Sequence, residues 1–172
     1  PLIAVIDSGA DYHHPDLRAN IAINEGEIPG DGIDNDGNGV VDDYFGYSAI
    51  DDNGDPLDRR GHGSHVTGTI AAVGNNGEGV VGVNWKARIL PIKIFNDQGV
   101  TNIAAILRAL AYAKSRGAFI TSNSWGGANF NQSVYDAFAA TPGLHVCAAG
   151  NDHQDIAKVG SYPANFDLPN LI

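Results

Sequence analysis

The chain has 172 residues, 43% of them hydrophobic, which is enough for one domain with a substantial apolar core. Its formal net charge is −10, which argues against nucleic acid or an anionic membrane as a partner. The single cysteine, Cys147, excludes an internal disulfide framework, and its apolar surroundings indicate a buried thiol. No apolar run approaches the roughly 20 residues that span a bilayer.

The first predicted element is a strand over residues 2–6, a short and continuous apolar run typical of a strand buried on both faces. Asp7 follows it directly. The carboxyl ends of strands in open α/β sheets are where ligands bind, although an aspartate there also caps turns through backbone amides. Taken alone, Asp7 therefore fits either role. Residues 14–17 form a predicted turn.

An acidic stretch follows at residues 31–45, where oxygen-bearing side chains alternate with other residues. This spacing matches the first nine places of a calcium loop, although the twelfth place is Phe45 instead of glutamate. A series of solvated Asn-Gly and Asp-Gly turns is the alternative. Crowded carboxylates repel one another without a cation, which favours Ca²⁺ as a cofactor. The candidate ligands are Asp34, Asp36, Asn38, Val40 and Asp42.

His62 lies between two glycines at the start of a run of small and β-branched residues. Small residues at the start of a helix indicate that another backbone segment comes close. Histidine suits proton transfer near neutral pH. Beyond it we predict strands over 89–94, 118–121 and 144–149, and helices over 101–117 and 131–141. Strands that alternate with helices predict a parallel sheet, so Asp7, Ser124 and Asn151 should meet at one edge.

Four motifs in this order resemble those of the subtilisin-like serine proteases. They are Val5–Gly9 with His14–Leu17, His62–Thr69, Ser124–Gly127 and Ala148–Asn151. The acidic stretch resembles a calcium-loop insert, at about 31–45, that some subtilases carry. The resemblance implies that residues 1–172 are part of one peptidase domain. It also implies a three-layer α/β fold with a mostly parallel sheet and helices on both faces, incomplete at the C-terminal end.

The resemblance implies a role for each matched residue in the hydrolysis of a polypeptide substrate. Asp7 would orient His62, His62 would act as general base, and Asn151 would stabilise the oxyanion. The implied substrate-binding residues are Gly99, Val100, Thr101, Ser124, Trp125, Gly126, Gly127, Ala149 and Gly150. A second implied calcium site takes Asp16, Val73, Asn76, Glu78 and Val80.

The family's nucleophilic serine motif matches no serine of residues 1–172. We therefore expect the nucleophile to lie outside this chain, which alone would be inactive. A noncatalytic, calcium-stabilised binding or structural domain is the alternative. Further expected partners are the remaining C-terminal part of the catalytic domain or a propeptide. Calcium dependence and the acidic surface indicate secretion, although Pro1 leads directly into a strand and no signal peptide is visible.

Overall fold

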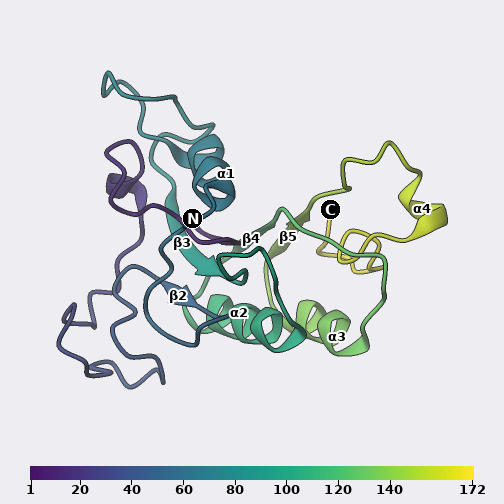
Figure 1. Ribbon diagram of the computed structural model, residues 1–172, viewed down its shortest axis with the longest axis horizontal. Helices are drawn as coiled ribbons and strands as arrows, with labels where there is room; N and C mark the ends of the chain where they lie inside the picture. The colour runs from purple at the N-terminus through teal and green to yellow at the C-terminus, as the bar shows by residue number, and fades with distance from the viewer.

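The computed structural model describes all residues from 1 to 172, and one five-stranded sheet forms its centre (Figure 1). The spatial order of the strands is β2-β3-β1-β4-β5, and every pair is parallel. The strands are β1 (Leu2–Asp7), β2 (Tyr47–Ser48), β3 (Arg88–Lys93), β4 (Ile120–Asn123) and β5 (Leu144–Cys147). The predicted parallel α/β sheet is confirmed.

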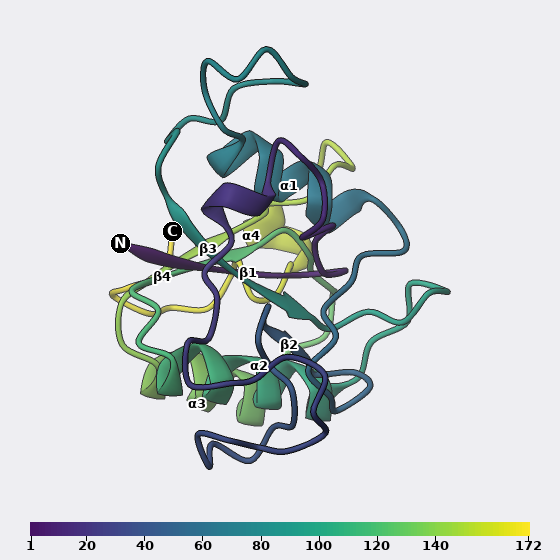
Figure 2. The ribbon, with the colours of Figure 1, turned by 90° about the vertical axis from the view of Figure 1, so that its left-hand side faces the viewer.

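Helices cover both faces of the sheet because alternate residues of β1 point to opposite sides. Ile3 and Val5 share an apolar cluster with Ala71 of α1, whereas Ala4 and Ile6 belong to the larger core between the sheet and helices α2 and α3. Figure 2 shows α1 above the sheet and α2 with α3 below it. The helices are α1 (His62–Ala71), α2 (Ile103–Ser115), α3 (Gln132–Ala140), the single-turn α4 (Ile156–Val159) and the 3₁₀ turn η1 (Arg18–Asn20).

The two helices below the sheet begin where the sequence predicts. Asn102 caps α2 by accepting a hydrogen bond from the amide of Ala105, and Asn131 caps α3 in the same way through Val134. Gly117 follows α2 with φ of +70°, a conformation that favours glycine and ends the helix. The capping residues and the glycine stop therefore agree with the three-dimensional arrangement. No helix of the structure has the length and apolar character needed to cross a bilayer.

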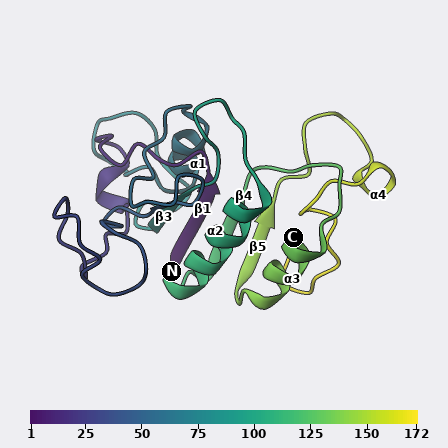
Figure 3. The same ribbon diagram turned by 60° about the horizontal axis from the view of Figure 1, so that its bottom comes forward.

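The carboxyl ends of the parallel strands meet at one edge of the sheet, since β1 and β5 run in the same direction (Figure 3). Asp7 is the last residue of β1, Ser124 follows β4, and Asn151 lies four residues beyond β5. The acidic stretch lies apart from this edge, in the loops that extend at the lower left of Figure 1. The fold therefore separates the predicted catalytic edge from the predicted calcium loop.

Candidate active site and acidic cluster

Two glycines flank His62 at the start of helix α1, and each is required for a different reason. Gly61 has φ of +89°, in the left-handed region that favours glycine. A Cβ atom on Gly63 would lie 2.1 Å from the carbonyl oxygen of Gly9, so only glycine fits there. The close backbone approach expected from the sequence is therefore present, and it involves the loop that follows β1.

His62 and Asp7 form a hydrogen-bonded pair at the edge of the sheet. The His62 Nδ1 atom lies 2.7 Å from Asp7 Oδ1, which also accepts a bond from the Ser8 amide at 2.7 Å. The Asp7 side chain is 2% exposed, whereas the His62 side chain is 59% exposed. Because Asp7 accepts the Nδ1 proton, the neutral ring presents an unprotonated Nε2 that is able to take a proton from a reacting group.

A pocket of about 680 Å³ lies beside the ends of β4 and β5. It brings together two of the predicted segments that are far apart in the sequence, 124–127 and 149–151. Gly127 exchanges two backbone hydrogen bonds with Tyr162, which fixes one wall of the pocket. The predicted residues that line it are Ser124, Trp125, Gly126, Gly127, Ala149, Gly150 and Asn151.

The third predicted substrate segment, Gly99 to Thr101, lies outside that pocket. Asn96 closes the turn before it, since its amide donates to the Val100 carbonyl and its side chain accepts from the Val100 amide. Gly99 has φ of +79°, and the guanidinium of Arg60 lies against it. Val100 is exposed, so this segment presents backbone and an apolar side chain to solvent.

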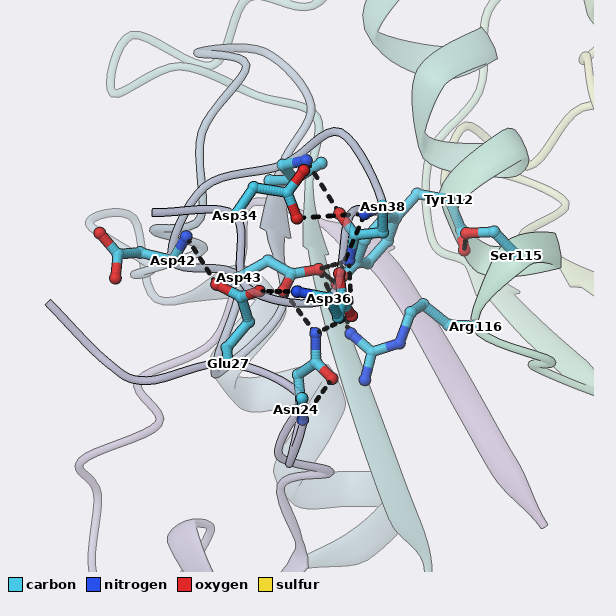
Figure 4. A network of polar contacts seen from close by, with 12 residues as sticks. Asn24, Glu27, Asp34, Asp36, Asn38, Asp42, Asp43, Tyr112, Ser115 and Arg116 are labelled. Carbon is cyan, nitrogen blue, oxygen red and sulfur yellow. Dashed lines mark hydrogen bonds and ion pairs between the residues drawn. The ribbon is translucent and has the colours of Figure 1, made fainter. Parts of the chain in front are cut away.

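Two carboxylates of the acidic stretch converge with a third from just before it, as Figure 4 shows. One oxygen from each of Glu27, Asp36 and Asp43 lies within 4.8 Å of the others. Glu27 and Asp43 are buried, and Asp36 is exposed. Oxygen donors of this kind and number suit a hard cation such as Ca²⁺. These three residues therefore fit a cation. Only Asp36 among them is a ligand that the sequence predicts.

Nearby side chains hold two of the three carboxylates, those of Asp43 and Asp36, in place. Asp43 accepts hydrogen bonds from the Tyr112 hydroxyl at 2.6 Å and from Asn24 Nδ2 at 2.6 Å, and it forms an ion pair with Arg116 at 3.4 Å. Although Asp36 is exposed, its neighbours remove part of its hydration, which acts to raise its pKa. Hydrogen bonds from Asn24 and Asn38 outweigh this effect and lower that pKa. The Asp36 carboxyl thus remains ionised over a wider pH range than an ordinary aspartate.

The other predicted ligands of this loop have different surroundings. Asp34 accepts backbone bonds from Gly37, Asn38 and Gly39. The Asp42 carboxylate points away from the three converging carboxylates (Figure 4) and accepts bonds from the amides of residues 30–32. Asn38 bonds Asp36 and Asp43 through Nδ2, and its Oδ1 accepts from the Val40 amide. The structure therefore brings Asp36 and Asn38 to the group but not Asp42.

Asp16 organises the loop that carries the second predicted calcium site. Its carboxylate accepts from Asn76 Nδ2 at 2.7 Å and from the Val80 amide at 2.9 Å, and its carbonyl accepts from the Val73 amide at 2.9 Å. Asn76 Oδ1 in turn accepts from the Glu78 amide. The bonds from Val80 and Asn76 lower the pKa of Asp16. All five predicted residues thus belong to one hydrogen-bonded loop.

Cys147 is the last residue of β5, where its side chain packs against the larger core. Burial raises the pKa of this thiol to about 12, although a hydrogen bond with Asn123 acts in the opposite direction. At neutral pH the side chain is therefore a thiol and a poor nucleophile. This environment agrees with a packing role.

A model of the subtilase family of peptidases matches residues 1–172. The chain belongs to the subtilase family. It is 43% identical over 124 residues to subtilisin-like protease 1 of Plasmodium berghei, a match that covers 72% of this chain and 21% of that protein. It is 37% identical to an intracellular serine protease of Paenibacillus polymyxa, with 96% of this chain and 46% of that protein covered.

Among solved structures, the chain is similar to the psychrophilic subtilisin-like protease Apa1 from the Antarctic psychrotroph Pseudoalteromonas sp. AS-11. The TM-score is 0.71 at 31% identity, and the match covers 99% of this chain and 35% of Apa1. This similarity confirms the subtilisin-like α/β fold. The chain spans between about a fifth and a half of the lengths of these relatives.

Proposed function

We propose that this chain is part of the catalytic domain of a serine endopeptidase. The hydrogen bond between His62 Nδ1 and Asp7 Oδ1 is the observation that carries the proposal. It supplies the base and the orienting carboxylate of an Asp-His-Ser triad at the ligand-binding edge of the sheet. Membership of the subtilase family supports the same conclusion. The nucleophilic serine would lie outside residues 1–172.

Each proton transfer in the proposed reaction passes through His62 Nε2. The ring takes the proton of the serine hydroxyl as the serine oxygen bonds to the carbonyl carbon of the substrate. It then gives that proton to the leaving amine when the peptide C–N bond breaks, and water repeats the sequence to release the acyl group. Asp7 stabilises the imidazolium that forms between these transfers and does not itself become protonated.

Asn151 would donate its side-chain amide to the oxyanion of the tetrahedral intermediate. Its location at the pocket beside β5 supports this role. The corresponding donor of subtilisin, a member of the same family, contributes about 10²–10³ in turnover. Extended segments at Gly99–Thr101 and Ser124–Gly127 would hold the polypeptide substrate by β-augmentation. The remaining part of the catalytic domain, or a propeptide, would be a further partner.

Calcium would act as a structural ion in this protein. The convergence of Glu27, Asp36 and Asp43 supports one site, and the loop around Asp16 supports a second. An ion there would offset the repulsion between carboxylates and tie the loops together, without taking part in proton transfer. Secretion remains a prediction, because the similar proteins include both an intracellular and a cell wall-associated protease.

Labelling with a fluorophosphonate probe tests the proposed activity. The full-length protein should react stoichiometrically, and mass spectrometry should locate the label on a serine outside residues 1–172. A His62→Ala variant of the same protein should react far more slowly, because the serine then lacks its base.

Two outcomes would contradict the proposal. Labelling of residues 1–172 expressed alone would show that the nucleophile lies within this chain. A full-length protein that folds but does not react would support the alternative, a noncatalytic calcium-stabilised peptide-binding or structural domain.

A further inference from the structure

Asp58 concentrates hydrogen bonds at the start of the helix that carries His62. Its Oδ1 accepts from the amides of Arg60 at 2.8 Å and Gly61 at 3.0 Å, the two residues that precede His62. Its Oδ2 accepts from both the amide and the hydroxyl of Ser64, each at 2.8 Å. The carboxylate therefore binds the chain on both sides of the histidine.

The same carboxylate reaches the end of β1 through Ser8, which is buried. The Ser8 hydroxyl donates to Asp58 Oδ1 at 3.0 Å and accepts from the Gly63 amide at 2.9 Å. Ser8 also donates its own amide to Asp7 Oδ1, the atom that binds the His62 ring. Asp58 and Ser8 thus connect the strand that carries Asp7 to the helix that carries His62.

A second link runs through Ser64. Its hydroxyl donates to Asp58 Oδ2 and accepts from the amide of Asp11 at 2.8 Å, in the loop that follows β1. Two hydroxyl groups therefore connect Asp58 to the same loop from different sides. The N-cap residue of helix α1 is Gly61, which has no side chain to cap the first turn. Asp58 supplies hydrogen bonds there instead.

The charge of Asp58 suits this place. A carboxylate at a helix N-terminus interacts favourably with the positive end of the helix dipole. Burial acts to raise the pKa of Asp58, but the amides of Arg60 and Ser64 and the Ser64 hydroxyl outweigh it and lower that pKa. The Asp58 carboxyl therefore stays ionised over a wider pH range than that of an ordinary aspartate.

We propose that Asp58 is a positioning residue, which aligns His62 with Asp7 by fixing the start of α1 to the end of β1. The proposal rests on the proposed peptidase function for its effect on turnover. Its effect on the histidine ring itself requires no serine. The hydrogen bonds of Asp58 go to its neighbours Ser8, Arg60, Gly61 and Ser64. It would therefore act through the position and the electrostatic environment of His62.

The test compares wild type with Asp58→Asn in the full-length protein. The amide presents N–H groups to the donors on Ser64, so the first turn of α1 must shift. We expect kcat per fluorophosphonate-titrated site to fall by about 10- to 100-fold with KM changed less than about twofold, since small misplacements have effects of that size. The His62 pKa, followed by NMR, should fall because a nearby negative charge that favours the imidazolium is lost.

Two further variants separate position from charge. Ser64→Ala keeps the Asp58 charge and removes both links made by the Ser64 hydroxyl, so kcat should fall while the His62 pKa stays near its wild-type value. Asp55→Asn removes a charge three residues from Asp58, from a carboxylate that binds Tyr12 and Leu57 instead of α1. It should leave kcat within about twofold of wild type.

A purely structural cap would lower only the unfolding temperature. Unchanged kcat per titrated site together with an unchanged His62 titration in Asp58→Asn would overturn the proposal. If wild type does not react with the probe, the proposed peptidase function is wrong, and the NMR titration of His62 alone tests the role of Asp58.

If Asp58→Asn does not fold, Ser64→Ala tests the role of Asp58 instead. Full turnover in Ser64→Ala would then count against the proposal.

Discussion

At the scale of the residue, His145 makes the stability of the protein depend on pH. The ring is fully buried, with Nε2 near the carbonyl oxygens of Phe138 and Thr141 and Nδ1 2.7 Å from the Thr121 hydroxyl. Carbonyl oxygens only accept, so Nε2 carries the proton and Nδ1 of the neutral ring accepts from Thr121. Burial lowers the pKa of His145, although the two carbonyls act in the opposite direction.

The free energy of unfolding should therefore fall as the pH falls below about 6.5, the pKa of an unfolded histidine. Below that value the unfolded chain binds a proton that the folded chain binds less readily, so acid favours unfolding. Urea unfolding of wild type and His145→Gln between pH 5 and 8 measures the effect. The variant should lose about 1–3 kcal/mol at pH 7 and show a weaker dependence on pH. Equal pH slopes in the two proteins would contradict this assignment.

The residues of the candidate site differ in how far the sequence predicts them. Asp7 follows an unbroken apolar run, and His62 lies in a glycine-rich helix start, so local pattern already identifies both as candidates. Their pairing joins positions 55 residues apart and comes from the fold. Glu27 and Asp43 were missed because they lie outside the alternating pattern. Their convergence with Asp36 depends on how the loop folds back.

At the scale of the element, long periodic segments are predicted best. The expected 101–117 helix is α2, whose buried residues recur along one face and whose start is capped by Asn102. Strand β2 has two residues and helix α4 has four, too few to show any period, so neither was predicted. These short elements form through contacts with distant segments, such as the pairing of β2 with β3.

The glycines of helix α1 give a prediction at the same scale. Gly63→Ala should destabilise the protein by on the order of 3 kcal/mol, because its Cβ would overlap the Gly9 carbonyl and push α1 away from β1. Gly68→Ala is the matched control, since its Cβ would lie 3.7 Å from Leu17, an ordinary contact. It should stabilise the helix by about 0.5–1 kcal/mol. Thermal unfolding of both variants measures the difference, and equal unfolding temperatures would refute the steric argument.

At the scale of the whole molecule, the converging acidic residues lie in a different region from the candidate catalytic pair. The Glu27, Asp36 and Asp43 group lies in the loops that lead into β2, whereas Asp7 and His62 lie at the carboxyl edge of the sheet. Arg116, from the end of α2, and Tyr112 both bind Asp43, so the acidic loop is tied to the helical layer below the sheet. An ion bound there would stabilise the loop and that layer together.

Removal of calcium should therefore lower the unfolding temperature of the full-length protein. An ion that binds only the folded state stabilises it by about 2.7 kcal/mol at a free concentration 100 times its Kd. Dialysis against EGTA should lower the unfolding temperature, and added Ca²⁺ should restore it. Asp36→Asn should reduce this calcium-dependent difference. Asp31→Asn is the control, because it removes an exposed carboxylate outside the converging group that accepts from Ile33 and Asn35. This variant should keep the calcium-dependent difference in unfolding temperature.

The loop around Asp16 requires a separate variant, because a second ion there would give the same response to EGTA. If both sites bind calcium, Asp36→Asn should keep part of the calcium-dependent difference in unfolding temperature. Asp16→Asn should remove that part, and the double variant should show no difference. The Asp16 carboxylate also accepts from Asn76 and Val80, so the single variant should be less stable even in EGTA. An unfolding temperature that neither EGTA nor added Ca²⁺ changes would show that the carboxylates are held by hydrogen bonds alone.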